Sequence, residues 1–265
     1  MGPNMSLAAG STFDLRQDAD GRSWDFTKAS DRREARERIG KEKPYLVVGS
    51  PPCTSYSALN VRWNYPKMDK REVQRRKAEG KVLLDFAIEI YEMQLRAGRH
   101  FLHEHPATAT SWNAENMKAL LSRRGVGTTV GDQCQYGLQT TDAQGNLRPA
   151  LKPTKFASSS QAVLHGLGRR CNRQHVHAPL LGGRAAAAAV YPPALCKAIL
   201  QGIEKQAQRE GRTPRAVQQV LDTGTGIYSL QTEERLRVDL EAEAQTHVQD
   251  ELEALEHYAQ NMRSR

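Results

Sequence analysis

The sequence predicts an α/β protein in which helices cover both faces of a mostly parallel sheet. Short apolar, β-branched runs alternate along the chain with longer segments of helical periodicity. Glycines end these elements cleanly, since Gly49 stops the strand-like run PYLVVGS (44–50) and Gly98 follows a helical stripe. The length of 265 residues is enough to bury one full core.

Each element is assigned from its own pattern. Strands are expected at 11–15, 44–50, 99–105 and 126–137, and helices at 28–42 and 82–97. Thr110 or Ser111 is the candidate cap of a third helix. The basic segment 61–80 is expected to be a connector, and TTDAQGNLRP (140–149) is typical of a loop or hairpin tip.

The C-terminal region differs from the rest in charge and pattern. Between Leu236 and Ala259, apolar residues fall every three or four positions, which predicts an amphipathic helix over 230–265. This segment is acidic, and a linker at 206–229 is expected to join it to a body spanning 1–205. We expect the helix to dock on that body or to mediate self-association with a second copy.

Composition narrows the possible partners and the compartment. The chain has a net charge of +8, and the basic residues are concentrated before the acidic tail, which favours a polyanion partner and nucleic acid first. No run approaches the roughly 20 apolar residues of a membrane span, and the N-terminus does not resemble a signal peptide. Four widely spaced cysteines suit a reducing compartment, so an intracellular location is expected.

Two reactive side chains follow predicted strands. Cys53 comes just after the strand at 44–50, and Glu104 closes the strand at 99–105. The working residues of an open parallel sheet gather beyond the carboxyl ends of its strands. A thiol there can act as a nucleophile and a carboxylic acid beside it can supply a proton.

Five segments, taken in order, resemble motifs of the DNA (cytosine-5) methyltransferases. VVGSPPCTSYS (47–57) is similar to the catalytic loop Gly-x-Pro-Pro-Cys-Gln-x-x-Ser, and FLHEHP (101–106) to a strand ending in Glu-Asn-Val. WDFTKAS (24–30) is similar to the acidic motif that touches the adenine of the cofactor. CQYGLQ (134–139) resembles Tyr-Gly-x-x-Gln, and 188–203 resembles Asn-Ala-Val-Pro-Pro-x-Leu followed by a helix.

The resemblance implies a Rossmann-like methyltransferase fold and methyl transfer from S-adenosylmethionine to C5 of cytosine in DNA. Cys53 would add covalently to the base, Glu104 would hold and protonate N3, and Ser57 would support the loop. The target base would leave the helical stack to be reached.

The same resemblance suggests binding residues. Asp25 and Phe26 match the adenine contacts, Pro51 and Pro52 belong to the catalytic loop, and Asp14 is a further candidate for the ribose. The recognition region is reduced to about 139–185. Basic residues that are candidates for DNA contact there are Arg148, Lys152 and Lys155.

Departures from the family pattern support an alternative. His105 and Pro106 replace Asn-Val, and the glycine-rich first cofactor motif has no good match before Asp25. The alternative function is therefore a catalytically inactive methyltransferase-fold remnant that binds nucleic acid. Methylation of an amino nitrogen or an RNA base ranks below both, because nitrogen methyltransferases place an aromatic residue where this chain has Cys53.

Two further patterns are weaker. RRCNRQHVHAPL (169–180) supplies possible zinc ligands, but the spacing matches no standard zinc signature, so a polar loop is favoured over zinc. VLDTGTG (220–226) resembles the Asp-Thr-Gly of aspartic proteases, but too little chain follows it for that fold, and a turn is favoured. The candidate zinc ligands are Cys134, Cys171, His175 and His177, with Cys196 as a further cysteine.

Overall fold

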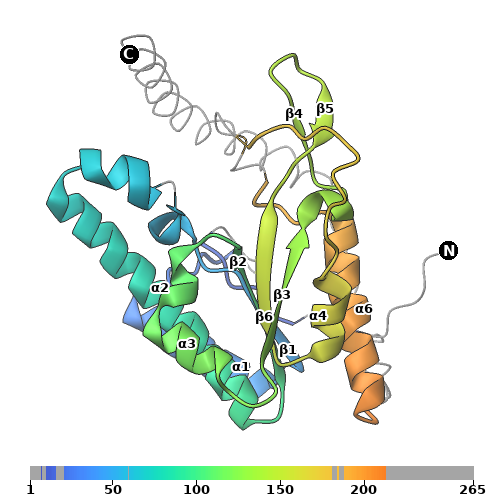
Figure 1. Cartoon of the computed structure of the whole chain (residues 1–265). Coiled ribbons are helices and arrows are strands. Elements are labelled where there is room, and N and C mark those ends of the chain that lie inside the picture. Colours follow the sequence, from blue (N-terminus) through green and yellow to red (C-terminus); the bar gives the residue numbers. More distant parts are fainter. Residues whose placement is uncertain are drawn as a thin grey trace. The chain divides into compact units, whose positions relative to one another are not determined.

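The computed structural model describes residues 7, 10–15, 21–58, 60–180, 184 and 188–212 (Figure 1). The expected acidic helix, most of the expected linker and the segment 220–226 lie outside these residues. The described chain divides into two compact units, and each is presented by itself. The first contains residues up to Gly131 together with Pro153–Arg169 and Ala198 onward, and the second contains Asp132–Lys152 and Arg170–Lys197.

The first unit is built on a four-stranded mixed sheet. Its order is β1 (Leu46–Gly49), β2 (His100–Pro106), β6 (Pro153–Ser158) and β3 (Gly127–Asp132). β1 and β2 are parallel, whereas β6 runs antiparallel to β2 and pairs Glu104 with Phe156. The α/β class is thus confirmed, and the β2–β6 pair inside the sheet is antiparallel.

Helices lie on both faces of this sheet, as expected. In Figure 1, α2 (Lys70–Arg96) and α3 (Glu115–Leu121) cover one face, while α4 (Gln161–Leu167) and α6 (Pro193–Arg209) cover the other. The buried face of α2 packs with β2 and α3 through Leu84, Tyr91, Phe101 and Met117. Burial of these large side chains is the main source of stability in this unit.

The N-terminal segment attaches through α1 (Ala29–Glu42). Ala35 and Ile39 of this helix pack with Trp24 and with Phe86 and Ile90 of α2. The strand expected at 11–15 is not formed. Instead, this segment is a loop in which the Asp14 carbonyl accepts a hydrogen bond from the Trp24 N–H at 2.7 Å.

Other differences from the sequence prediction have local causes. α2 begins at Lys70, well inside the expected connector, because the Asp69 carboxylate caps the Arg71 and Glu72 N–H groups at 2.9 and 3.1 Å. α6 continues to Arg209, so the first residues of the expected linker are helical. β6 and α4 were not predicted. Short helical turns occur at Thr54–Tyr56, Asn60–Asn64, Tyr65–Lys67, Thr110–Asn113 and Gln133–Tyr136.

The second unit has little regular structure. Its hairpin pairs β4 (Gln139–Thr141) with β5 (Leu147–Pro149), which confirms the expected hairpin. Its small apolar cluster consists of Leu138, Ala150 and Ala188, with Leu180 partly buried against it. In neither unit do the described helices include one with the length and apolarity needed to cross a membrane.

Candidate active site at the ends of β1 and β2

The register of β1 and β2 brings Cys53 and Glu104 to the same edge of the sheet. Gly49, the last residue of β1, pairs with His103, and Glu104 is the next residue of β2. Cys53 lies in the loop that leaves β1 at this edge and precedes the turn Thr54–Tyr56. The two strands are parallel, so their pairing places both residues at one carboxyl edge of the sheet.

Gly49 is required by the packing of α2 against β1. A Cβ at this position would clash with the Tyr91 hydroxyl oxygen. That hydroxyl lies 3.0 Å from His103 Nδ1, and both side chains are buried. Burial raises the pKa of Tyr91, with a further contribution from Glu104, so the phenol stays neutral. The glycine before the Pro-Pro-Cys sequence therefore allows a buried Tyr–His pair beneath the loop.

His105 ties the cysteine loop directly to β2. Its Nε2 lies 2.8 Å from the Pro51 carbonyl oxygen, and its Nδ1 lies 2.7 Å from Ser111 Oγ. A carbonyl can only accept, so Nε2 carries the proton and Nδ1 accepts from the serine. Burial lowers the pKa of His105 to about 4, which keeps this tautomer neutral near pH 7. A histidine thus braces the loop where the resembling family has an asparagine.

Further hydrogen bonds fix the loop on its other sides. Ser55 Oγ donates to the Arg76 carbonyl at 2.8 Å, and Thr110 Oγ1 donates to the Tyr56 carbonyl at 3.2 Å. Ser57 Oγ accepts from the Asn60 N–H at 3.4 Å, which agrees with a loop-supporting role. These contacts leave Cys53 half-buried at the edge of the unit.

Glu104 is more deeply buried than Cys53. It is only 6% exposed and stands between the buried residues His103 and His105 on β2. A buried carboxyl group is the type of acid that can hold a proton for transfer to a substrate. The edge therefore combines a half-accessible thiol with a buried acid.

The residues matched to the cofactor do not form a cradle for it. The Asp25 carboxylate accepts from the Thr27 N–H and hydroxyl at 3.0 and 2.6 Å, and this local turn lowers its pKa. The Phe26 ring packs on Phe86 with centroids 4.7 Å apart. Asp14 is exposed in the N-terminal loop, Pro51 is half-buried and Pro52 is exposed. In the described part of the chain, no strand precedes β1 to present a glycine-rich loop.

The three candidate DNA contacts are divided between the two units. Arg148 pairs with Asp142 at 3.3 Å on the hairpin, and Lys152 Nζ donates to the Ala188 carbonyl at 2.9 Å, both within the second unit. Lys155 belongs to the first unit, where it pairs with His105 across β2 and β6. Its Nζ lies 4.7 Å from the centroid of the Trp112 ring. Lys155 therefore lies beside the strand that carries Glu104 and His105.

A basic cleft between α4 and α6 was missed by sequence reasoning. This cavity has a volume of about 600 Å³ and is lined by small residues and by basic side chains. The basic residues are His165, Arg169, Lys205 and Arg209. The helices approach closely because a Cβ at Gly202 would lie 2.6 Å from Val163 Cα. The cleft forms where two helices distant in sequence pack together, and one of them, α4, was not predicted from the sequence.

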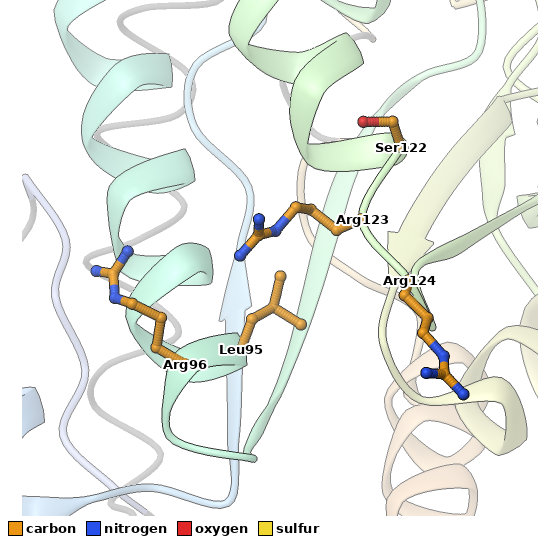
Figure 2. A pocket seen from close by; sticks show the side chains of 5 residues that line it. All are labelled: Leu95, Arg96, Ser122, Arg123 and Arg124. Carbon is orange, nitrogen blue, oxygen red and sulfur yellow. The ribbon is translucent and has the colours of Figure 1, made fainter.

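A second basic cavity lies between α2 and α3. It measures about 450 Å³ and is lined by Leu95, Arg96, Ser122, Arg123 and Arg124 (Figure 2). Arg124 points away from Arg96 and Arg123 (Figure 2), and Arg123 pairs with Glu92 at 3.3 Å. These side chains do not converge on a common point (Figure 2).

The remaining sequence candidates, Cys134, Cys171, His175 and His177, come together in the second unit. No family model, curated protein or solved structure matches the chain.

Proposed function

We propose that this chain binds nucleic acid and that Cys53 adds to C6 of a cytosine base, the covalent step of cytosine-5 methyl transfer. The observation that supports it best is the His105–Pro51 hydrogen bond, which holds the Pro-Pro-Cys loop against the strand that carries Glu104. Pre-organising a nucleophile and an acid at one edge is what such a step needs.

The step conserves atoms and charge. Cys53, as the thiolate, forms a bond from Sγ to C6, and the C5=C6 electron pair shifts toward C4. The C4=N3 pair moves to N3, which takes a proton from Glu104. The resulting enamine is nucleophilic at C5. C5 then takes a hydrogen ion from water, and loss of the original C5 proton to water, expulsion of the thiolate and return of the N3 proton to Glu104 restore the aromatic base.

Methyl transfer to C5 is the step that would follow the addition of Cys53. The methyl donor implied by the resemblance is S-adenosylmethionine, and the described residues do not form a cradle for it. For that reason the proposal is carried by the addition step, which takes place before any methyl group moves.

The addition step has its own readout. A cytosine held as the enamine exchanges its C5 hydrogen with solvent, so incubation of cytosine-containing DNA in D₂O should place deuterium at C5. We expect exchange with the wild-type chain and with Cys196→Ser, which alters an exposed thiol outside the edge. Cys53→Ser should abolish it. Exchange that persists in Cys53→Ser would refute the role of Cys53.

One observation favours a second candidate, an inactive remnant that binds nucleic acid. The cofactor-matching Asp25 is engaged by its own turn, as described above. The basic cleft between α4 and α6 would serve such a remnant equally well, because phosphate contacts need only positioned cations. Exchange together with methyl transfer supports the enzyme. DNA binding with neither exchange nor methyl transfer supports the remnant.

A further inference from the structure

Two cysteines and two histidines of the second unit point their ligand atoms at one small volume. The Sγ and Nε2 atoms of Cys134, Cys171, His175 and His177 all lie within 4.8 Å of one another. Cys134 comes from the turn after β3, and the others come from a single loop. The cluster therefore joins two segments that are far apart in the sequence.

The spacing of these atoms matches a tetrahedral metal site. Cys171 Sγ lies 3.5 Å from Nε2 of both His175 and His177, and Cys134 Sγ lies 3.4 Å from His177 Nε2. A tetrahedral zinc ion with Zn–S of about 2.3 Å and Zn–N of about 2.0–2.1 Å separates a sulfur from a nitrogen by about 3.5 Å. The two Nε2 atoms are 2.9 Å apart, somewhat closer than the roughly 3.3 Å of the ideal arrangement.

The surroundings suit a bound cation. Asp132 is buried, and its Oδ2 accepts the Cys171 N–H at 2.8 Å and pairs with Arg170 at 3.2 Å. The Arg173 N–H points at Cys171 Sγ at 3.2 Å, an orientation that a left-handed backbone at Arg173 (φ 59°) makes possible. Such outer contacts orient metal ligands and stabilise a thiolate.

The described residues of the second unit have little else to hold them together. Its apolar cluster is limited to Leu138, Ala150 and Ala188 with Leu180 beside them, and its one described sheet is the short β4–β5 hairpin. Small units with a sparse core usually depend on a cross-link or a metal. A metal at the cluster would connect the turn after β3 to the loop 171–177.

We propose that Cys134, Cys171, His175 and His177 bind one zinc ion that holds the second unit together. Thiolate and imidazole are ligands that zinc prefers, and two thiolates balance its charge. Four protein ligands leave no open position for a substrate, so the site is structural rather than catalytic. This inference is independent of the proposed chemistry at Cys53.

The direct test is the metal content of the purified full-length chain, followed by replacement with Co²⁺. We expect one zinc per chain in the wild type and in the control Cys196→Ser. Titration of the metal-free chain with CoCl₂ should give intense tetrahedral ligand-field bands and thiolate-to-cobalt charge transfer. Zinc-free protein that gives only a weak octahedral cobalt spectrum would overturn the proposal.

Variants separate metal binding from folding. Cys171→Ser should lose the bound zinc. Because that variant could also unfold the unit, Cys134→His provides a second readout, since it keeps four ligands but removes one thiolate. Its cobalt complex should stay tetrahedral with about half the charge-transfer intensity, in line with the ligand types that zinc sites use. Unchanged charge transfer in Cys134→His would exclude Cys134 as a ligand.

Discussion

The loops that carry Cys53 and Cys171 fix a cysteine in opposite ways. The Cys53 loop rests on a deep apolar core and is tied to β2 by His105, with Tyr91 and His103 beneath it. The Cys171 loop has only a small apolar cluster in its unit, and its sulfur faces two imidazoles and another thiol. One arrangement leaves a half-buried thiol at the edge of a sheet, and the other surrounds a half-buried thiol with two imidazoles and a second thiol.

The surroundings of Cys53 and Cys171 suit the two cysteines to different roles. A nucleophile needs rigid support and a side that is open to the substrate. The hydrophobic core supports the Cys53 loop, and the half-buried position of the thiol leaves one side open. A structural metal site needs several donor atoms that converge on one point. The bound metal then supplies folding free energy that a small apolar cluster does not. The following predictions test whether the two loops are as different as the contacts indicate.

The largest effect should come from the acid at the Cys53 edge. Glu104→Gln removes the proton donor while keeping the shape of the side chain, and the C5 exchange rate should fall by about 10²–10⁴-fold. DNA affinity, measured by fluorescence anisotropy, should change little, because the acid acts mainly as the base is attacked. An unaltered exchange rate with weakened DNA binding would contradict the role of Glu104.

Metal removal should affect the regions around the two loops differently. After treatment with a chelator, amide hydrogen exchange should accelerate in 132–152 and 170–180, because their order is attributed to the metal. The amides of β1 and β2 should retain their protection, which depends on the apolar core. Equal loss of protection in both regions would show that the cluster is not a local support of its unit.

Acid should destabilise the Cys53 edge through its buried histidines. Burial lowers the pKa of His105 from 6.5 to about 4 and that of His103 well below 6.5. Between these values the unfolded chain binds more protons than the folded one, so stability is full above pH 6.5 and falls as the pH drops toward 4. For His105 alone the loss is about 3 kcal/mol, measurable by urea denaturation across this range.

The smallest effect concerns the brace itself. His105→Asn should keep a donor to the Pro51 carbonyl and retain much of the exchange activity, while it removes the His105 share of the acid sensitivity. His105→Phe leaves the carbonyl and Ser111 without this partner and should cost about 1–3 kcal/mol of stability. If the asparagine and phenylalanine variants behave alike in both assays, the hydrogen bond is not what positions the loop.

The sequence was informative where the signal is local. Gly49 and Cys53 sit in one short run, and the strands on either side of α2 were predicted because each has its own apolar pattern. The hairpin was predicted from its turn residues for the same reason. The expected strand at 11–15 was wrong, because its pattern had no neighbouring strand to pair with in the described part of the chain.

The parts that were missed depend on contacts between distant segments. His105 stands where the resembling motif has asparagine, and the contact of its imidazole with the Pro51 carbonyl joins two segments that are distant in sequence. Cys134 was a candidate beside Cys196, because no spacing could indicate which of the two distant cysteines joins Cys171, and the structure brings Cys134 to it. The basic cleft required knowledge of α4, whose seven residues are too few to show a helical period clearly.

The central claim is that Cys53 is the thiol that attacks the base. The most direct measurement is to incubate the full-length chain with DNA containing 2-pyrimidinone, whose C6 accepts a thiolate more readily than that of cytosine, and to locate the adduct by peptide mass spectrometry. We predict a single adduct on the peptide that contains Cys53, absent in Cys53→Ser. An adduct on Cys134, Cys171 or Cys196, or no adduct on DNA that the chain demonstrably binds, would contradict the claim.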